Sequence, residues 1–231
     1  MEYEIRPISP DEWLPDRCLP PGAPLDPAEL KPEHGCESLA EHCEKFMPPS
    51  RKLLEGLYRD TIDRFGCCGF VAWSDDRIVG YNNFFPREVA QDVRFHGWGT
   101  HEDEEPQTLV HNCISVLRNS AYRRKGIGTN LIKKSLSWGK ANGWKRFEVH
   151  QVMPDDPTNF ENMQKSAVSF WQKLGFEVYR TRIDFNIVRT IAGWEGVSVK
   201  TEDEATEFWP DWKDRCLVAS MATDLTTWEK N

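Results

Sequence analysis

The sequence predicts an α/β fold, α+β by some schemes, in which helices flank one central sheet. Segments with strand-like apolar patterns alternate along the chain with segments in which apolar residues recur at helical spacing. Hydrophobic residues make up 39% of the 231 residues and charged residues 29%, which leaves enough apolar material for a sizeable core. We therefore expect one large domain, with or without an appendage.

The first half of the chain is expected to contain a strand, a helix and a hairpin. Residues 2–9 alternate like a first strand, and the proline-rich residues 19–32 are expected to be largely loop. Residues 50–66 place apolar side chains at helical spacing and end at a glycine. Two apolar runs, 67–73 and 78–85, flank a short polar segment, which predicts a hairpin.

The second half is expected to alternate strands with helices. Residues 109–117 and 145–153 are strand candidates, and apolar spacing predicts a helix between them that runs from 127 to 143. A second amphipathic helix is expected over 163–174, followed by a strand-like stretch, 176–191.

The domain organisation that we expect is a main domain, 1–192, followed by a tail, 193–231. The tail carries four tryptophans among acidic residues and is too short for an independent domain. It is expected to be a mostly helical extension packed on the main domain.

Net charge and apolar patterning exclude several functions. A net charge of −8 and a pI near 5.3 argue against a nucleic-acid binder and suit an amine-bearing or cationic substrate. No run approaches the ~18 apolar residues of a membrane span, and the N-terminal residues lack the apolar centre of a signal peptide. No membrane partner and a cytoplasmic location are therefore expected.

The seven cysteines are expected to be mainly free thiols, because the number is odd and no secretory signal is present. His34, Cys36, His42 and Cys43 are zinc-type ligands, but the paired Cys-x-x-Cys spacing of a structural zinc site is absent. No metal is expected, although this cluster leaves zinc open as an alternative to a helix with incidental thiols and imidazoles.

A basic, glycine-containing loop, 121–131, follows the 109–117 strand and opens a helix. Backbone N–H groups at a helix start bind phosphate, and glycines let the backbone approach closely. The loop lacks the third glycine of a dinucleotide fingerprint and does not fit a P-loop. A phosphate cradle and an ordinary basic surface turn both remain open from the loop alone.

Two motifs resemble those of the GNAT N-acetyltransferase superfamily. The run from Arg123 to Gly128 fits the pyrophosphate-binding pattern Q/R-x-x-G-x-G/A. Downstream, "SAVSFWQKLGFEV" is similar to the A-x-x-L-Y-x-K-x-G-F helix and strand of that family, and "FEVH" is similar to its fifth strand. The resemblance is centred on core motifs in 109–183.

The resemblance implies a GNAT fold, a mixed sheet with two splayed strands between which acetyl-CoA enters as co-substrate. The backbone of the 109–117 strand would pair with the pantetheine arm, the glycine loop would hold the pyrophosphate, and the downstream helix would contact the arm. The residues so implied are Ile114, Ser115, Val116, Arg123, Arg124, Lys125, Gly126, Ile127, Gly128, Thr129, Phe170 and Trp171.

Three residues are candidate bases that would deprotonate the amine: Glu148, His150 and His111. His111 and Cys113 are expected on one strand face, which keeps an acyl-cysteine route as a minor alternative. Trp171 stands where the family often carries a tyrosine acid, and an indole N–H cannot fill that role. We expect it to pack against the cofactor arm or in the core.

The predicted function is transfer of an acetyl group from acetyl-CoA directly to a primary amine on a small molecule or peptide, which makes the chain an N-acetyltransferase. Residues 19–65, residues 87–106 and the tryptophan-rich tail are expected to build the acceptor side, and acidic runs at 101–105 and 201–207 favour a cationic acceptor. The alternative is a non-catalytic acyl-CoA-binding module. A homodimer is also open, because the family often dimerises.

Overall fold

One seven-stranded mixed sheet organises the residues that the computed structural model describes, 2–9, 48–74, 77–90, 107–116, 122, 124–153, 168–185, 187–188, 192 and 197–229. The strands are β1 (Glu4–Pro7), β2 (Gly69–Ser74), β3 (Arg77–Pro86), β4 (Thr108–Val116), β5 (Arg146–Met153), β6 (Glu177–Ile183) and β7 (Leu217–Asp224). The helices are α2 (Pro48–Phe65), α3 (Arg87–Ala90), α4 (Ile127–Ala141), α6 (Val168–Gln172), α8 (Glu202–Phe208) and α9 (Trp212–Arg215). The expected α/β fold, a central mixed sheet flanked by helices, is confirmed.

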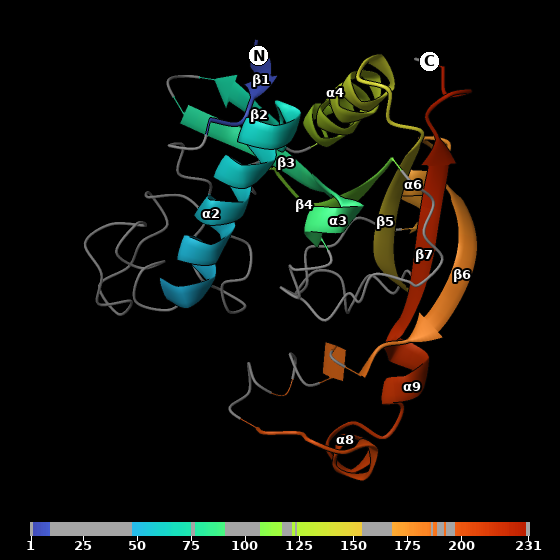
Figure 1. Cartoon of the computed structure of the whole chain (residues 1–231). Helices are drawn as coiled ribbons and strands as arrows, with labels where there is room; N and C mark the ends of the chain where they lie inside the picture. Colours follow the sequence, from blue (N-terminus) through green and yellow to red (C-terminus); the bar gives the residue numbers. More distant parts are fainter. Residues whose placement is uncertain are drawn as a thin grey trace.

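The sheet has two antiparallel halves joined by one parallel contact. Its order is β1-β2-β3-β4-β5-β7-β6, and only β4 and β5 pair in parallel. Figure 1 shows β5, β7 and β6 as one group of ribbons and β2 to β4 as another, running in a different direction. The expected splay of two neighbouring strands lies between these halves.

The face of the sheet beneath α4 and α6 carries the larger apolar core. Helix α4 buries one stripe of residues at helical spacing, including Ile127, Leu131 and Leu136. These side chains pack with inward-facing strand residues such as Leu109 and Phe147. Hydrophobic burial on this face therefore fixes the helix that follows the basic loop.

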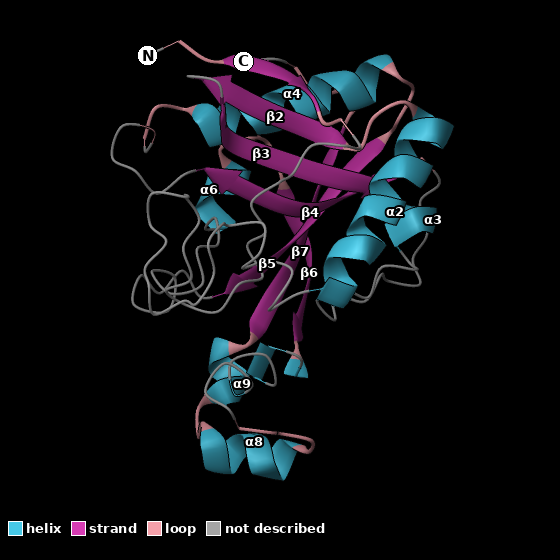
Figure 2. Cartoon of the chain, turned by 90° about the vertical axis from the view of Figure 1, so that its left-hand side faces the viewer, coloured by secondary structure: helices cyan, strands magenta, loops and turns pink. Residues whose placement is uncertain are grey.

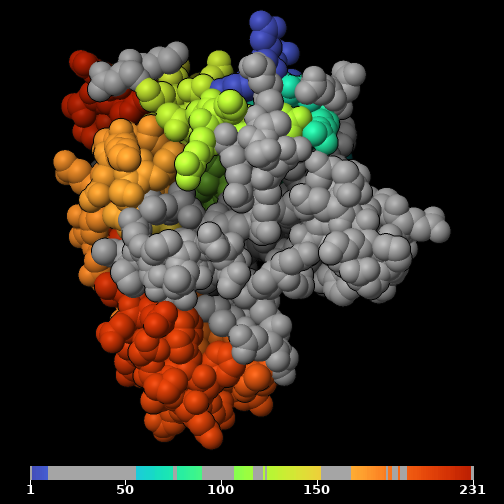
Figure 3. Space-filling view, turned by 180° about the vertical axis from the view of Figure 1, so that it is seen from behind, coloured from blue at the N-terminus to red at the C-terminus, as the bar shows by residue number. Residues whose placement is uncertain are grey.

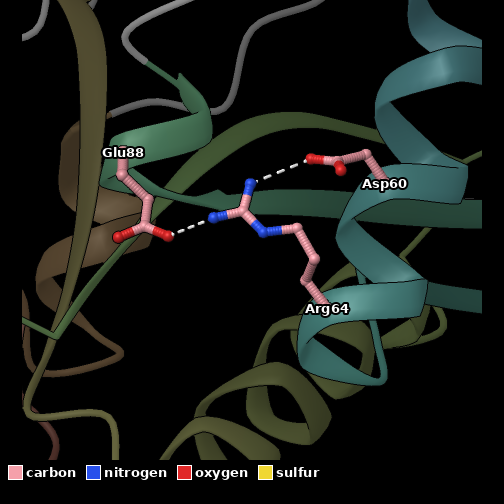
Figure 4. Close-up of polar contacts among 3 residues, drawn as sticks. All are labelled: Asp60, Arg64 and Glu88. Carbon is pink, nitrogen blue, oxygen red and sulfur yellow. Dashed lines mark hydrogen bonds and ion pairs between the residues drawn. The ribbon is translucent and has the colours of Figure 1, made fainter.

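The opposite face is covered by α2 and α3 (Figure 2). Tyr58 of α2 packs here in a second buried cluster with Val71, Tyr81 and Phe85. An exposed ion-pair chain, Arg64 with Asp60 at 3.0 Å and with Glu88 at 2.6 Å, joins α2 to α3 (Figure 4). Surface pairs of this kind add little stability, typically ~0.2–1 kcal/mol, so the buried contacts of α3, such as Val89, hold it more firmly.

The prediction that residues 193–231 form a mostly helical extension is wrong, because β7 lies inside the sheet between β5 and β6. Residues Val218 to Met221 are buried on both faces of the strand. A strand covered on both faces has no alternating polar pattern, and Leu217–Asp224 also lacks the dense apolar runs by which β2 and β3, which are largely buried too, were predicted.

A second small core follows β6, where the sequence predicted that a strand continues to residue 191. The strand ends at Ile183, and Ile187, Val188 and Trp212 instead pack in a separate cluster. The described residues between β6 and β7, which carry this cluster, form the lobe at the bottom of Figure 3, drawn in orange and red. None of the described helices combines the length and apolar character that a membrane-spanning helix needs.

Candidate active site

Strands β4 and β5 separate after three paired positions. Their registered pairs run from Thr108↔Arg146 to Val110↔Glu148. The register of β4 against β3 shifts just beyond this point, so that Asn112 is an extra residue between the pairs His111↔Phe84 and Cys113↔Asn83. A bulge bends and twists its strand, and we attribute the divergence of β4 from β5 to this bulge.

The N-terminus of α4 lies beside the open part of β4. Its N-cap, Gly126, has φ 77°, no side chain caps the helix, and no acidic residue lies in the first turn. The first N–H groups of a helix have no acceptor within the helix and carry its positive dipole end. A Cβ on Gly128 would lie 3.4 Å from Cδ1 of Ile114 and 3.7 Å from Cγ2 of Val116, so the helix start packs directly on β4.

The loop before α4 is anchored at Tyr122, which is buried and accepts a hydrogen bond of 2.9 Å from Nη2 of Arg77. Arg124 adopts a left-handed φ of 56°, and its side chain and that of Lys125 are exposed. These conformations turn the chain sharply into the helix while leaving two cations at its start. Arg123 lies outside the described residues.

The residues predicted to contact the pantetheine arm divide between the two faces of β4. Ile114 and Val116 pack against the core beneath α4, whereas Ser115 is buried on the other face. In the described part of the chain, the edge of β4 toward β5 has no registered strand partner beyond Val110. This open edge is the feature that an extended ligand could pair with.

Trp171 is fully buried in the core beneath α6, which is one of the two placements expected for it. Its Nε1–H donates to Oε1 of Gln151 at 3.3 Å, and its ring makes edge contacts with His111 at 4.8 Å and with Phe170 at 5.3 Å. Phe170 is partly buried against the same core. His111 therefore belongs to the face of α4 and α6.

Glu148 faces the opposite side and is held by two guanidinium groups. Its two carboxylate oxygens are engaged separately, one by Nη2 of Arg87 and the other by Nε of Arg146 at 2.7 Å. The Glu148 and Arg87 side chains are only 4% and 7% exposed. Protonation of Glu148 would break a charge-assisted hydrogen bond, so the carboxylate is arranged as an ion-pair anchor between α3 and β5.

His150 lies two residues further along β5, on the same face, where β4 has already diverged. Its Nδ1 is 3.0 Å from Oγ of Ser220 on the neighbouring strand β7. Nearby, burial and the Glu148 charge raise the pKa of Tyr179 above its ordinary value, while Arg146 opposes the shift. The structure thus brings Glu148 and His150 together and separates them from His111.

The expectation that His111 and Cys113 share a face is wrong. His111 contacts Trp171, whereas the Sγ of Cys113 is 3.6 Å from the hydroxyl of Tyr81 in the cluster beneath α2. The bulge at Asn112 inserts one residue, which reverses the expected alternation.

Sequence reasoning also missed the partners that position the candidate bases. Arg146 could have been found, because it stands two residues before Glu148 on one strand and period 2 places both on one face. Arg87 and Ser220 come from distant segments, and no local pattern marks them.

Metal ligands are not gathered in the described part of the chain: no group of three or more His, Cys, Asp or Glu residues there could hold an ion. The cluster of His34, Cys36, His42 and Cys43 lies outside the described residues.

Comparison with known families identifies the class of protein. Residues 36–176, more than half of the chain, match the family described as "Acetyltransferase (GNAT) family". The chain belongs to this family of acetyltransferases, as the two motifs predicted. A search of curated proteins finds no match to the chain.

Solved structures with a similar arrangement include several acetyltransferases. An N-acetyltransferase from Staphylococcus aureus Mu50 is 14% identical, with 97% of this chain and 99% of that chain covered and a TM-score of 0.48. The ribosomal-protein-S18-alanine N-acetyltransferase from Escherichia coli is 13% identical, with 83% and 89% covered and a TM-score of 0.45. A Bacillus subtilis acetyltransferase in complex with CoA is 16% identical, with 72% and 83% covered and a TM-score of 0.41.

Proposed function

We propose that the protein transfers an acetyl group from acetyl-CoA directly to a primary amine. The observation that carries this proposal is the junction of the open β4 edge with the uncapped start of α4. A Cβ on Gly128 would lie 3.4 Å from Ile114 there, so the proposed phosphate site and the strand-like binding edge are adjacent. A ligand with a pyrophosphate and an amide-bearing arm, such as acetyl-CoA, fits this pair of features.

In this proposal the backbone N–H groups of Gly126 to Thr129 hold the pyrophosphate, and Arg124 and Lys125 add charge at the exposed loop. The backbone of Ile114 to Val116 pairs with the pantetheine amides. Phe170 offers an apolar contact to the arm, while Trp171 supports it from the core.

The amine must reach the thioester uncharged, and His150 is the residue that we assign to remove its proton. Ser220 can accept a hydrogen bond from Nδ1–H of His150, and in that tautomer Nε2 is the basic nitrogen of the ring, to which we assign the proton transfer. Glu148 is less suited, because Arg87 and Arg146 engage both of its oxygens. We assign Glu148 a structural role at the last registered pair of β4 and β5, where the two strands begin to separate.

The carbonyl oxygen of the acetyl group gains negative charge as the amine attacks. A backbone N–H of β4 near the bulge is the donor that we assign to it. The C–S bond then breaks and releases CoA as thiolate. Trp171 cannot protonate it, since an indole N–H is not an acid at working pH. Thiolate is a tolerable leaving group, with an ordinary thiol pKa of ~8.5, and water can protonate it.

The acceptor remains a prediction that rests on sequence composition. The acidic run 101–105 lies outside the described residues. The run 201–207 forms α8, where Glu204 completes a capping box with Thr201 and Glu202 pairs with Lys213 at 2.7 Å. Two of its four acidic residues, Glu202 and Glu204, thus have local partners, so the cationic acceptor depends mainly on 101–105. The cytoplasmic location and the homodimer stay predictions.

The test combines ligand binding with turnover. Calorimetric titration should give saturable binding of CoA and none of NAD, and acetyl-CoA should be consumed with at least one class of amine among peptide N-termini, lysine, polyamines and aminoglycosides. Absence of CoA binding would refute the proposal outright. Binding without turnover of any amine would favour a non-catalytic acyl-CoA-binding module, an alternative that the buried tryptophan at 171 keeps open.

A further inference from the structure

Two consecutive asparagines in β3 are buried and bonded to opposite faces of the sheet. Asn82 is 0% exposed and accepts a hydrogen bond of 2.9 Å from the Ser135 hydroxyl of α4. Asn83 is 1% exposed and belongs to the face beneath α2. An apolar residue would cost less free energy to bury at either position, so each amide must be offset by the hydrogen bonds that it makes.

The Asn83 amide joins α2 to the β4 bulge. Its Nδ2 donates to the hydroxyl of Tyr58 at 2.5 Å, and its Oδ1 accepts from Nδ2 of Asn112 at 3.3 Å. Asn112 is the extra residue of the bulge. The ring of Tyr58 stacks on Phe85 with centroids 5.9 Å apart, so the far end of this chain of bonds is itself fixed by packing.

The bulge is the point at which β4 leaves β5, since the last registered pair is Val110↔Glu148. A bulge disrupts the local ladder and leaves an extra residue whose backbone the regular pairing does not orient. The side-chain bond from Asn112 to Asn83 supplies an orientation that the ladder does not. Rotation of this peptide would redirect the N–H groups along the open edge of β4.

We propose that Tyr58, Asn83 and Asn112 are positioning residues that hold the β4 bulge, so that its backbone N–H meets the acyl oxygen during transfer. This inference rests on the proposed acetyl transfer. The chain of bonds lies on the face opposite α4, whose first turn is assigned to the pyrophosphate. Loss of the chain should therefore lower kcat while CoA binding is retained.

A matched pair of variants tests the inference. Tyr58→Phe and Ser135→Ala each remove one hydroxyl that bonds to a β3 asparagine, on opposite faces of the sheet. Tyr58→Phe keeps the ring stacked on Phe85. We expect kcat to fall about tenfold in Tyr58→Phe, less than the ~100-fold or more for a lost oxyanion donor, with CoA affinity unchanged. In Ser135→Ala, kcat should stay within about twofold, because its bond reaches neither the bulge nor the first turn of α4.

Hydrogen exchange gives a readout that needs no turnover. Relative to the wild type and to Ser135→Ala, the amides of Asn112 and Cys113 should exchange faster in Tyr58→Phe and faster still in Asn83→Ala. Equal exchange at the bulge, or equal kcat in the wild type and Tyr58→Phe, would overturn the positioning role and leave acetyl transfer standing. A wild type that binds CoA but acetylates nothing would instead refute the proposed function.

Discussion

The two faces of the sheet are buried by different means. Beneath α4 and α6, the core is formed mainly by apolar side chains such as Leu131 and Phe147. Beneath α2 and α3, apolar side chains share the interior with an ion pair of Arg87 and Glu148 and with the Asn83 amide. The mainly apolar face holds the helix that begins at the proposed phosphate site and buries two neutral hydrogen bonds, Ser135 to Asn82 and Trp171 to Gln151. The polar face carries the buried ion pair and His150, the proposed base.

This difference indicates a division of labour between binding and chemistry. Apolar packing is tolerant of exchange between side chains of similar volume, whereas buried charges and amides depend on specific partners. Substitutions on the polar face should therefore separate stability from activity in ways that substitutions on the apolar face do not.

The largest effect is expected at Arg87. Arg87→Ala leaves the buried Glu148 carboxylate with one of its two guanidinium partners, and unfolding free energy should fall by roughly 3 kcal/mol. The adjacent Glu88→Ala removes only an exposed pair with Arg64 and should cost about 0.5 kcal/mol or less. Urea unfolding of both variants measures the contrast.

A double variant checks the cause of that loss. Glu148→Gln in the Arg87→Ala background removes the buried charge that has lost one of its two partners and should recover part of the lost stability. If the double variant is no more stable than Arg87→Ala, the cost comes from lost packing of the Arg87 side chain rather than from the buried charge.

The second prediction contrasts the histidines of the two faces. His150→Gln should lower kcat about 100-fold, equivalent to ~2.7 kcal/mol, because the assigned base is lost. It should also abolish the acidic limb of the pH–rate profile. His111→Gln, on the face of Trp171, should keep that limb. Steady-state rates from pH 5 to pH 9 decide between them, and an acidic limb that disappears only in His111→Gln would reverse the assignment.

Much of this arrangement could be predicted from the sequence. Apolar patterns located β1 to β5 and the helix α4, and the glycine loop was correctly placed at the start of that helix, because these signals are local in the chain. Three features could not be predicted. The bulge at Asn112 has no sequence pattern, β7 mixes small and polar residues with its buried apolar ones, and the Arg87–Glu148 pair joins segments far apart in sequence. Each depends on tertiary contacts.

The third prediction concerns the two glycines of the loop. Gly126 has φ 77°, so Gly126→Ala forces a side chain into a left-handed conformation at a cost of ~1 kcal/mol or more. Gly128→Ala adds the same methyl at ordinary contact distance from Ile114 and Val116. We expect CoA affinity to fall about tenfold in the first variant and less than about threefold in the second, by calorimetry. Equal losses in both variants would mean that the added methyl, not the backbone conformation, matters.

The smallest electrostatic effect at neutral pH is expected at two adjacent cysteines that belong to the clusters on opposite faces of the sheet. Burial raises the pKa of the Cys67 thiol to about 11, against the opposing hydrogen bond with Gly69, and burial raises the pKa of Cys68 further. In the unfolded chain a thiol ionises near ~8.5. Both thiols are therefore neutral in the folded and the unfolded protein at pH 7. At that pH their ionisation contributes nothing to the free energy of unfolding.

Above pH 7 the raised pKa values of the two thiols decide whether stability rises or falls with pH. The unfolded chain loses thiol protons from about pH 8.5 while the folded protein retains them, so stability falls as the pH rises toward 11. Cys67→Ala and Cys68→Ala should each reduce the alkaline fall in urea-unfolding free energy, measured at pH 7, 9 and 10.5. Cys68 belongs to the α2 face and is 0% exposed. A reduced fall only in Cys67→Ala would mean that water reaches the α2 face. Comparable reductions would mean that water is excluded from both thiols. The buried ion pair and the hydrogen bonds of Asn83 would then lie in a water-excluded region, where hydrogen bonds are strong.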